Sequence, residues 1–127
     1  WVTRDTSRRW YSVAMSGDGA LQTAVAHIDY IYTSNWGNNP WNPKGSVLAW
    51  KAVAVSSNGI FQTAVAGNGS IYVSSDSGSN WAAKGQLLGW SAVSVSSGGS
   101  IMVAVENTSE GSGGKIYEST DSGNSWN

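Results

Sequence analysis

The sequence predicts an all-β chain built from three copies of one four-stranded unit. Tryptophans give a period of 40 residues, because two series share that spacing: Trp1, Trp41 and Trp81, and Trp10, Trp50 and Trp90. The segments that follow the second series, such as WKAVAVSSNGIFQTAVA after Ala49, are variants of one pattern with alternating apolar positions and Gly-containing turns. No segment keeps a helical period of 3.6 residues over three turns.

The period divides the chain into repeats at 10–49, 50–89 and 90–127, preceded by residues 1–9. In the second repeat we expect strands at 50–56, 61–66 and 71–75, joined by the turns SNG and GNGS. A weaker fourth strand, AAKGQLL, follows Trp81 and leads into the next repeat. In the third repeat the Trp series continues at Trp126 after 45 positions, and the extra five residues fall in the Gly/Ser-rich stretch 106–115.

Four-stranded units of about 40 residues are typical of β-propeller blades. Propellers close with about four to eight blades, so three blades leave two faces uncovered. Two solutions stay open: the chain is a piece of a longer propeller, or a second copy completes a six-bladed ring as a homodimer. We favour the homodimer, in which residues 1–9 form an outer strand that completes the last blade of the other copy.

Composition excludes several classes of function. A net charge of −1, with seven basic and eight acidic residues, lacks the basic patch that nucleic acids and anionic membrane surfaces require. No apolar run is long enough to insert into a membrane as a helix. The chain has no cysteine, and His27 is its only histidine, so neither a metal site nor a cofactor is expected. The compartment stays open, with an extracellular or surface-exposed setting favoured.

One phrase occurs twice, as SSDSGSNW at 74–81 and STDSGNSW at 119–126. In such a turn the Asp accepts backbone N–H groups, the Gly allows a positive φ and the Trp packs against the strands. The phrase resembles the Asp-box, or BNR repeat, found between the third and fourth strands of sialidase-like propeller blades. The resemblance implies a structural role, on the rim away from the ligand face, for Ser74, Asp76, Gly78, Trp81, Ser119, Asp121, Gly123 and Trp126.

The first repeat departs from this phrase. In SNWGNNPW, residues 34–41, Trp36 replaces the Asp and Asn38 replaces the Gly. Two interpretations stay open: Trp36 packs on the rim of a degenerate turn, or it is exposed and stacks on a sugar or on another protein. Trp36 is also the one tryptophan outside the two series and their continuation at Trp126, so it is the aromatic candidate for binding.

A second set of candidates is polar. The loop between the second and third strands and the connection between blades are expected on one face of the ring, usually the ligand face. The candidates for a polar or anionic ligand on this face are Arg4, Arg8, Arg9, His27, Asp29, Glu106 and Asn107. The alternative is a solvated linker whose arginines pair with nearby acids.

The chain is expected to bind rather than to catalyse. Sialidases hold a carboxylate with arginines from separate blades, whereas the second and third repeats here contain no Arg. We therefore expect no catalytic residues and favour a multivalent, lectin-like module that binds glycans through several equivalent sites. The alternatives are a protein-interaction, assembly or adhesion propeller, and a fragment of an Asp-box glycosidase.

Overall fold

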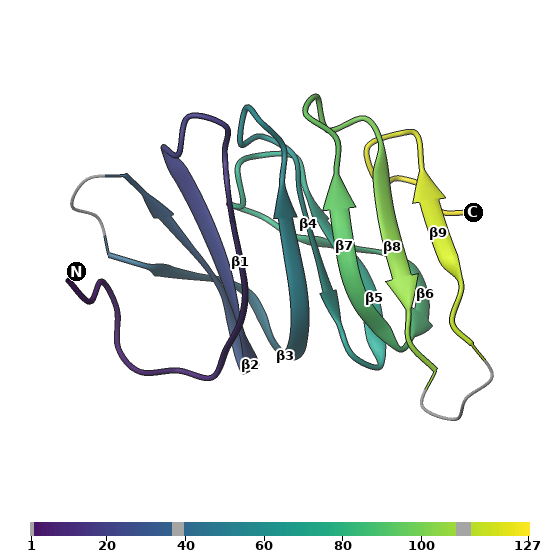
Figure 1. Ribbon diagram of the computed structural model, residues 1–127, viewed down its shortest axis with the longest axis horizontal. Helices are drawn as coiled ribbons and strands as arrows, with labels where there is room; N and C mark the ends of the chain where they lie inside the picture. Colours follow the sequence, from purple (N-terminus) through teal and green to yellow (C-terminus); the bar gives the residue numbers. More distant parts are fainter. Residues whose placement is uncertain (1, 37–39, 109–112) are drawn as a thin grey trace.

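The computed structural model describes residues 2–36, 40–108 and 113–127. Within these ranges every regular element is a strand and all pairings are antiparallel, which confirms the predicted all-β class (Figure 1). The strands are β1 (Trp10–Met15), β2 (Leu21–Asn35), β3 (Asn42–Val55), β4 (Gln62–Ala66), β5 (Gly69–Ser74), β6 (Ala82–Leu88), β7 (Trp90–Val95), β8 (Met102–Glu106) and β9 (Ile116–Ser119). The described residues include no helix that could span a membrane.

The described strands form three blades. Blade 1 consists of β1, β2 and the first half of β3; blade 2 consists of the second half of β3 with β4, β5 and β6; blade 3 consists of β7, β8 and β9. The first strand of each blade begins with the same register shift, between Trp10 and Ser12, between Trp50 and Ala52, and between Trp90 and Ala92. The sequence period is thus also a period of backbone geometry.

Apolar side chains fill the two spaces between neighbouring blades. Between blades 1 and 2, Val25 and Ile31 of one blade pack with Trp50 and Val53 of the next, and Trp81 packs on this cluster. The equivalent cluster between blades 2 and 3 contains Val65, Ile71, Trp90, Met102 and Ala104. Figure 1 shows the blades side by side along the long axis, so the core of the protein lies between sheets.

A Trp–Tyr pair recurs inside every blade. The rings of Trp10 and Tyr32 meet edge to face at 5.4 Å, those of Trp50 and Tyr72 at 5.0 Å, and those of Trp90 and Tyr117 at 5.1 Å. Trp50 and Trp90 also donate their indole N–H groups to the carbonyls of Ser46 and Gln86. Trp10, Trp50 and Trp90 therefore have a structural role in their blades.

The two copies of the repeated phrase form the same turn, after β5 and after β9. Ser74 Oγ donates to Asp76 Oδ1 at 2.8 Å, while Gly78 N–H donates to Ser74 Oγ at 2.9 Å and Asn80 N–H donates to Asp76 Oδ1 at 2.9 Å. Ser119, Asp121, Gly123 and Ser125 repeat these contacts after β9.

The glycine of this turn also lies against the preceding blade. Gly78 has a φ of +79°, and a Cβ there would lie 2.9 Å from Thr33 of blade 1. Gly123 has a φ of +85°, and a Cβ there would lie 2.6 Å from Val73 of blade 2. Both constraints require glycine, so the turn fixes its own backbone and the spacing of two blades.

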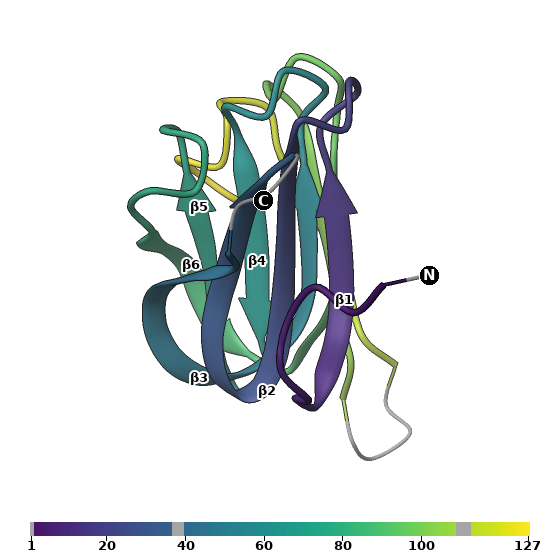
Figure 2. The same cartoon turned by 90° about the vertical axis from the view of Figure 1, so that its left-hand side faces the viewer.

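Residues 2–9 contain no strand within the single chain. Figure 2 views the molecule from the side of blade 1 and shows this segment curling beside the lower end of β1. Its last residue is held, because His27 N–H donates to the Arg9 carbonyl at 2.9 Å. The predicted pairing of residues 1–9 with the last blade of another copy concerns a second chain and stays a prediction.

Thr63 provides a test of the packing between blades. Thr23 Oγ1 donates to Gln62 Oε1 at 2.8 Å across the first interface. In the next repeat Thr63 corresponds to Thr23 and Met102 corresponds to Gln62, and the buried hydroxyl of Thr63 has no partner among the described residues. We expect Thr63→Val to raise the free energy of unfolding by about 1 kcal/mol, because it removes an unsatisfied buried hydroxyl. Thr23→Val should lower it by about 1–3 kcal/mol, because Gln62 loses a buried donor. Urea unfolding of both variants measures this, and shifts of the same sign would contradict the assignment.

The carboxylate of Asp121 makes stability depend on pH. Hydrogen bonds from the Ser125 hydroxyl, the Ser125 N–H and Ser119 lower its pKa from 3.8 to about 2. A carboxyl with a lowered pKa in the folded state stabilises that state above its unfolded pKa, and the contribution is lost as the pH falls toward its folded pKa. We expect the stability difference between the protein and Asp121→Asn to be constant above about pH 4 and to shrink toward pH 2. Thermal unfolding at pH 7, 4 and 2 checks this; a difference unchanged at pH 2 would show that the carboxylate does not carry it.

Candidate functional site

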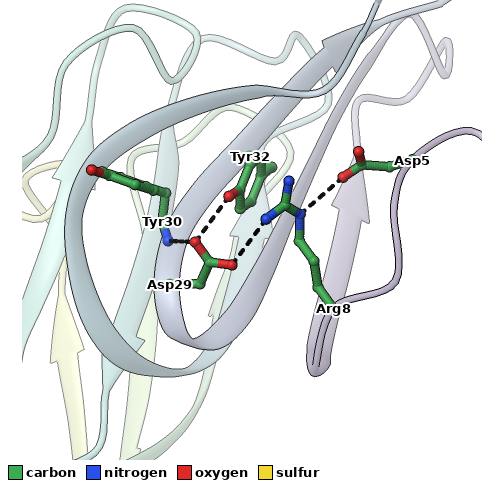
Figure 3. A network of polar contacts seen from close by, with 5 residues as sticks. All are labelled: Asp5, Arg8, Asp29, Tyr30 and Tyr32. Carbon is green, nitrogen blue, oxygen red and sulfur yellow. Dashed lines mark hydrogen bonds and ion pairs between the residues drawn. The ribbon is translucent and has the colours of Figure 1, made fainter.

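Two of the predicted polar candidates, Arg8 and Asp29, bind each other. Arg8 Nη1 lies 3.2 Å from Asp29 Oδ2, and Arg8 Nε lies 3.2 Å from Asp5 Oδ2 (Figure 3). The guanidinium also lies over the Tyr32 ring, 4.3 Å from its centroid. Asp29 Oδ1 accepts the Tyr32 hydroxyl at 2.9 Å and the Tyr30 N–H at 2.8 Å. Arg8 therefore directs its Nε and Nη1 donors to carboxylates of the same chain.

The repeat explains why this cluster occurs only once. Arg8 occupies the position of Leu48 and Leu88, which pack on the apolar clusters between the blades. Its guanidinium lies on Tyr32 of blade 1 where those repeats place a leucine. Asp29 stands at the position of Gly69, so blade 1 supplies the carboxylate that a cation at position 8 requires. The cluster is a polar replacement of an apolar contact.

The ionisation of the cluster is fixed by its contacts. Burial is the largest influence on the Asp29 carboxyl and raises its pKa, but bonds from Tyr30 N–H, the Tyr32 hydroxyl and Arg8 outweigh it and lower the pKa overall. Burial, followed by the bond to Asp29, raises the pKa of Tyr32 to about 12. Asp29 is thus an anion and Tyr32 a neutral donor over the physiological range, so neither group suits proton transfer near neutral pH.

The only histidine lies in an aromatic stack beside this cluster. The rings of His27 and Tyr11 are 5.1 Å apart and nearly parallel, and Lys51 Nζ lies 5.0 Å from the centre of the Tyr11 ring. His27 Nδ1 is buried and has no hydrogen-bond partner among the described residues. The stack joins blade 1 to the first strand of blade 2.

The remaining polar candidates are divided between blades. Arg4 and Arg9 are exposed on the N-terminal segment, and neither makes an ion pair with a described residue. Glu106 ends β8 on blade 3, and Asn107 N–H donates to the Gly89 carbonyl at 2.6 Å. The single chain therefore does not bring the predicted polar candidates into one site. Within the described residues no group of His, Asp and Glu is placed to hold a metal ion.

Trp36 is exposed on the opposite rim. The side chain is 78% exposed, while its backbone is fixed by a bond from Trp36 N–H to the Ala20 carbonyl at 2.7 Å. It borders a depression of about 360 Å³ that residues of blades 1 and 2 line with both apolar and polar groups: Ser16, Asp18, Ala20, Leu21, Asn35, Asn58 and Ser77. Asn38, the other departure from the phrase, lies outside the described residues.

Turn contacts orient the polar groups of this depression. Asp18 Oδ1 accepts the Ser16 hydroxyl at 2.6 Å and the Ala20 N–H at 2.9 Å. Asn58 repeats the arrangement on blade 2, where its Oδ1 accepts the Ser56 hydroxyl and the Ile60 N–H. In both residues the second terminal atom, Asp18 Oδ2 or Asn58 Nδ2, is not used by these contacts. Asp18 and Asn58 could not be found as site residues from the sequence, because nothing in it shows that turns of two blades approach the same tryptophan.

A larger groove lies on the outer face of blade 1, and sequence reasoning did not find it. It has a volume of about 470 Å³ and is lined by Thr3, Arg4, Asp5, Trp10, Tyr11, Ser12, Val13, Ala24 and Trp41. Three of these residues, Trp10, Val13 and Ala24, occupy the repeat positions of Trp50, Val53 and Ala64, which are buried between blades 1 and 2. A position-by-position comparison of the repeats would reveal the groove, because it shows which residues of blade 1 have buried counterparts in blade 2.

No family model matches the sequence, and no curated protein sequence is significantly similar to it. Solved structures do resemble it. YCF48 bound to a D1 peptide matches with a TM-score of 0.76 at 17% identity, over 99% of this chain and 42% of that one. A nidogen–laminin complex matches with a TM-score of 0.73 at 11% identity, over 94% of this chain and 47% of that one.

A glycoside hydrolase of family GH74 from Niastella koreensis matches with a TM-score of 0.69 at 17% identity, over 93% of this chain but 17% of that enzyme. The chain thus spans less than half the length of each of these three structures. At such identities the likeness shows the fold alone. The fold is that of part of a β-propeller.

A double-mutant cycle tests whether Arg8 and Asp29 are structural partners. We expect Arg8→Leu and Asp29→Asn each to lower the free energy of unfolding, and the double variant to lose less than the sum, with a coupling of up to about 1 kcal/mol. Guanidinium unfolding at pH 7 measures the four proteins. Arg9→Leu, at an exposed neighbouring position, is the control. Strictly additive losses would mean that the pair contributes nothing to stability.

Proposed function

We propose that the chain is a non-catalytic binding module of a β-propeller and that it binds a neutral glycan on Trp36. The observation that carries the proposal is an indole 78% exposed beside a depression of about 360 Å³ that contains polar side chains from two blades. Indole rings cover the apolar faces of sugar rings, while amides, hydroxyls and carboxylates bind their hydroxyl groups. Asp18, Asn35 and Asn58 offer such groups beside the ring.

The loss of the phrase in the first repeat supports this use of Trp36. We propose that the turns at 74–81 and 119–126 are Asp-boxes with a purely structural role. Trp36 stands at the position of Asp76 and Asp121, where a carboxylate fastens the turn. An indole cannot accept hydrogen bonds from those N–H groups. The first repeat therefore lacks the hydrogen bonds that hold the turn and has an exposed aromatic surface instead.

One Trp36 per chain makes multivalency depend on assembly. The proposed glycan site is single in each chain, rather than repeated in every blade as the sequence interpretation expected. We propose that two copies form a closed homodimeric ring, which would present two Trp36 surfaces and gain avidity on a repetitive glycan.

Protein interaction is the second candidate function. The apolar side chains on the outer face of blade 1 favour it, and two of the similar structures are complexes, YCF48 with a D1 peptide and nidogen with laminin. The GH74 likeness raises a glycosidase fragment as a third candidate. Against it, Asp5 and Asp29, two acids that lie beside the same arginine, are both engaged by Arg8.

Glycan binding is tested with cellopentaose, chitopentaose and mannopentaose as probes. We expect at least one to shift the tryptophan emission of the protein to shorter wavelength with saturation, because it covers the exposed indole. Trp36→Ala should abolish that binding, and Trp36→Phe should weaken it because the smaller ring offers less area to the sugar.

Leu87→Ala, at another exposed apolar position, is the matched control and should bind like the unchanged protein. Isothermal titration of the responding sugar measures each affinity. Binding that survives Trp36→Ala would place the site elsewhere. No response to any of the three sugars, with a protein partner bound at blade 1, would favour the second candidate.

A further inference from the structure

We propose that the groove on blade 1 is the docking site for blade 3 of a second copy of this chain. The inference rests on the proposed homodimer and specifies which faces meet. The groove on one copy receives the side chains of Val105 and Ile116 from the other, and the same contact in the opposite direction closes the ring.

The internal interfaces show what such a groove holds. Val25 and Ile31 of blade 1 pack on Trp50 and Val53 of blade 2. Their equivalents Val65 and Ile71 of blade 2 pack on Trp90 and Val93 of blade 3. The next equivalents along the chain are Val105 and Ile116 of blade 3. By the same pattern they would cover Trp10 and Val13 on blade 1 of the second copy.

Exposure shows that these two faces lack their partners. Trp10 is 39% exposed, whereas Trp50 is 0% and Trp90 2% exposed. Val13 is 69% exposed against 6% for Val53, and Ile116 is 73% exposed against 0% for Ile31 and Ile71. Apolar side chains at otherwise buried positions form a surface that association would remove from water. The two faces are complementary, because they are the two sides of one repeated interface.

Backbone hydrogen bonds continue the same series. Gly17 N–H donates to the Ser57 carbonyl at 2.8 Å, and Ser57 N–H donates to the Ser97 carbonyl at 2.9 Å. Ser97 N–H has no acceptor among the described residues. The Gly17 carbonyl of a second copy occupies the next position in the series and supplies that acceptor, which fixes the register of docking.

The N-terminal segment lies where the docked blade needs it. His27 N–H donates to the Arg9 carbonyl as Gly67 N–H donates to Ala49 and Asn107 N–H donates to Gly89. Arg9 therefore occupies the place at which the outer strand of a preceding blade ends. Docking puts the edge of β9 from the second copy beside residues 2–9, which then have a strand to pair with.

Two charged substitutions test the docking without disturbing the single chain. The mass of the unchanged protein in light scattering should be twice the 13.3 kDa of one chain. Val13→Glu and Ile116→Lys should each reduce it to the mass of one chain, because each puts a charge into an apolar interface. Both residues are largely exposed within one chain, so circular dichroism and the unfolding midpoint of each monomer should show a folded protein.

Mixing the two variants gives the decisive result. A mixed pair has one interface with neither substitution and one in which Glu at position 13 faces Lys at position 116. We therefore expect an equimolar mixture to recover the doubled mass, although neither variant does so alone. A contact of one face with itself would give no such recovery.

Three outcomes would overturn the proposal. They are an unchanged protein with the mass of one chain up to millimolar concentration, variants that keep the doubled mass, and a mixture that stays monomeric. Leu87→Glu, exposed on β6 outside both faces, is the control and should keep the doubled mass. Trp36→Ala should keep it too, so failure of docking and failure of glycan binding are read separately.

Discussion

The structure depends on one constraint: a blade can bury its apolar residues only against another blade. Each sheet is a single layer, and its valines, isoleucines and first tryptophan point into the space between sheets. Trp50 is fully buried because blade 1 precedes it, while Trp10 has the same position and stays partly in water. Burial in this chain is therefore a property of neighbouring pairs of blades, as in other repeat proteins.

The sequence predicted most of the fold because the repeat was readable. The period, the strands of blade 2 and the turns at 74–81 and 119–126 all follow from patterns that sterics and hydrogen bonding impose locally. Blade boundaries were harder to see in the strands themselves, since β2 and β3 each run through more than one predicted strand.

The candidate sites were less predictable, because they depend on contacts between segments far apart in the chain. The sequence suggested Arg8 as a ligand-binding residue, because it does not show that Asp29, 21 positions away, is its partner. The role of Trp36 stayed undecided because exposure is set by the packing around it. The groove beside Trp10 could not be found from residue types, since the same types line a filled interface between blades 1 and 2.

Variation between the repeats is concentrated where blades do not touch. Most positions inside the interfaces keep Val, Ile, Ala or Trp, although Gln62 corresponds to Met102, whereas the rim holds Asp76 and Asp121 in the second and third repeats and Trp36 in the first. The loop before the third strand holds Asp29, Gly69 or an insertion at corresponding places. A substitution at the rim removes the hydrogen bonds that hold a single turn. A substitution inside an interface disturbs the packing of two blades. The rims are thus free to acquire binding residues.

The equal spacing of the blades has a further consequence for how such a protein changes over time. Every interface is built from the same positions, so a unit of 40 residues can be lost or gained without harming either end face. In the proposed six-bladed ring, a chain that lost one unit would still carry both faces and would need three copies to complete the circle, whereas a chain that gained one unit would supply four blades, a number that does not divide six. If the angle between blades did not divide the circle evenly, the same faces would add copies without end and form a fibre. The angle between adjacent blades therefore determines which numbers of repeats per chain give closed rings and which give fibres.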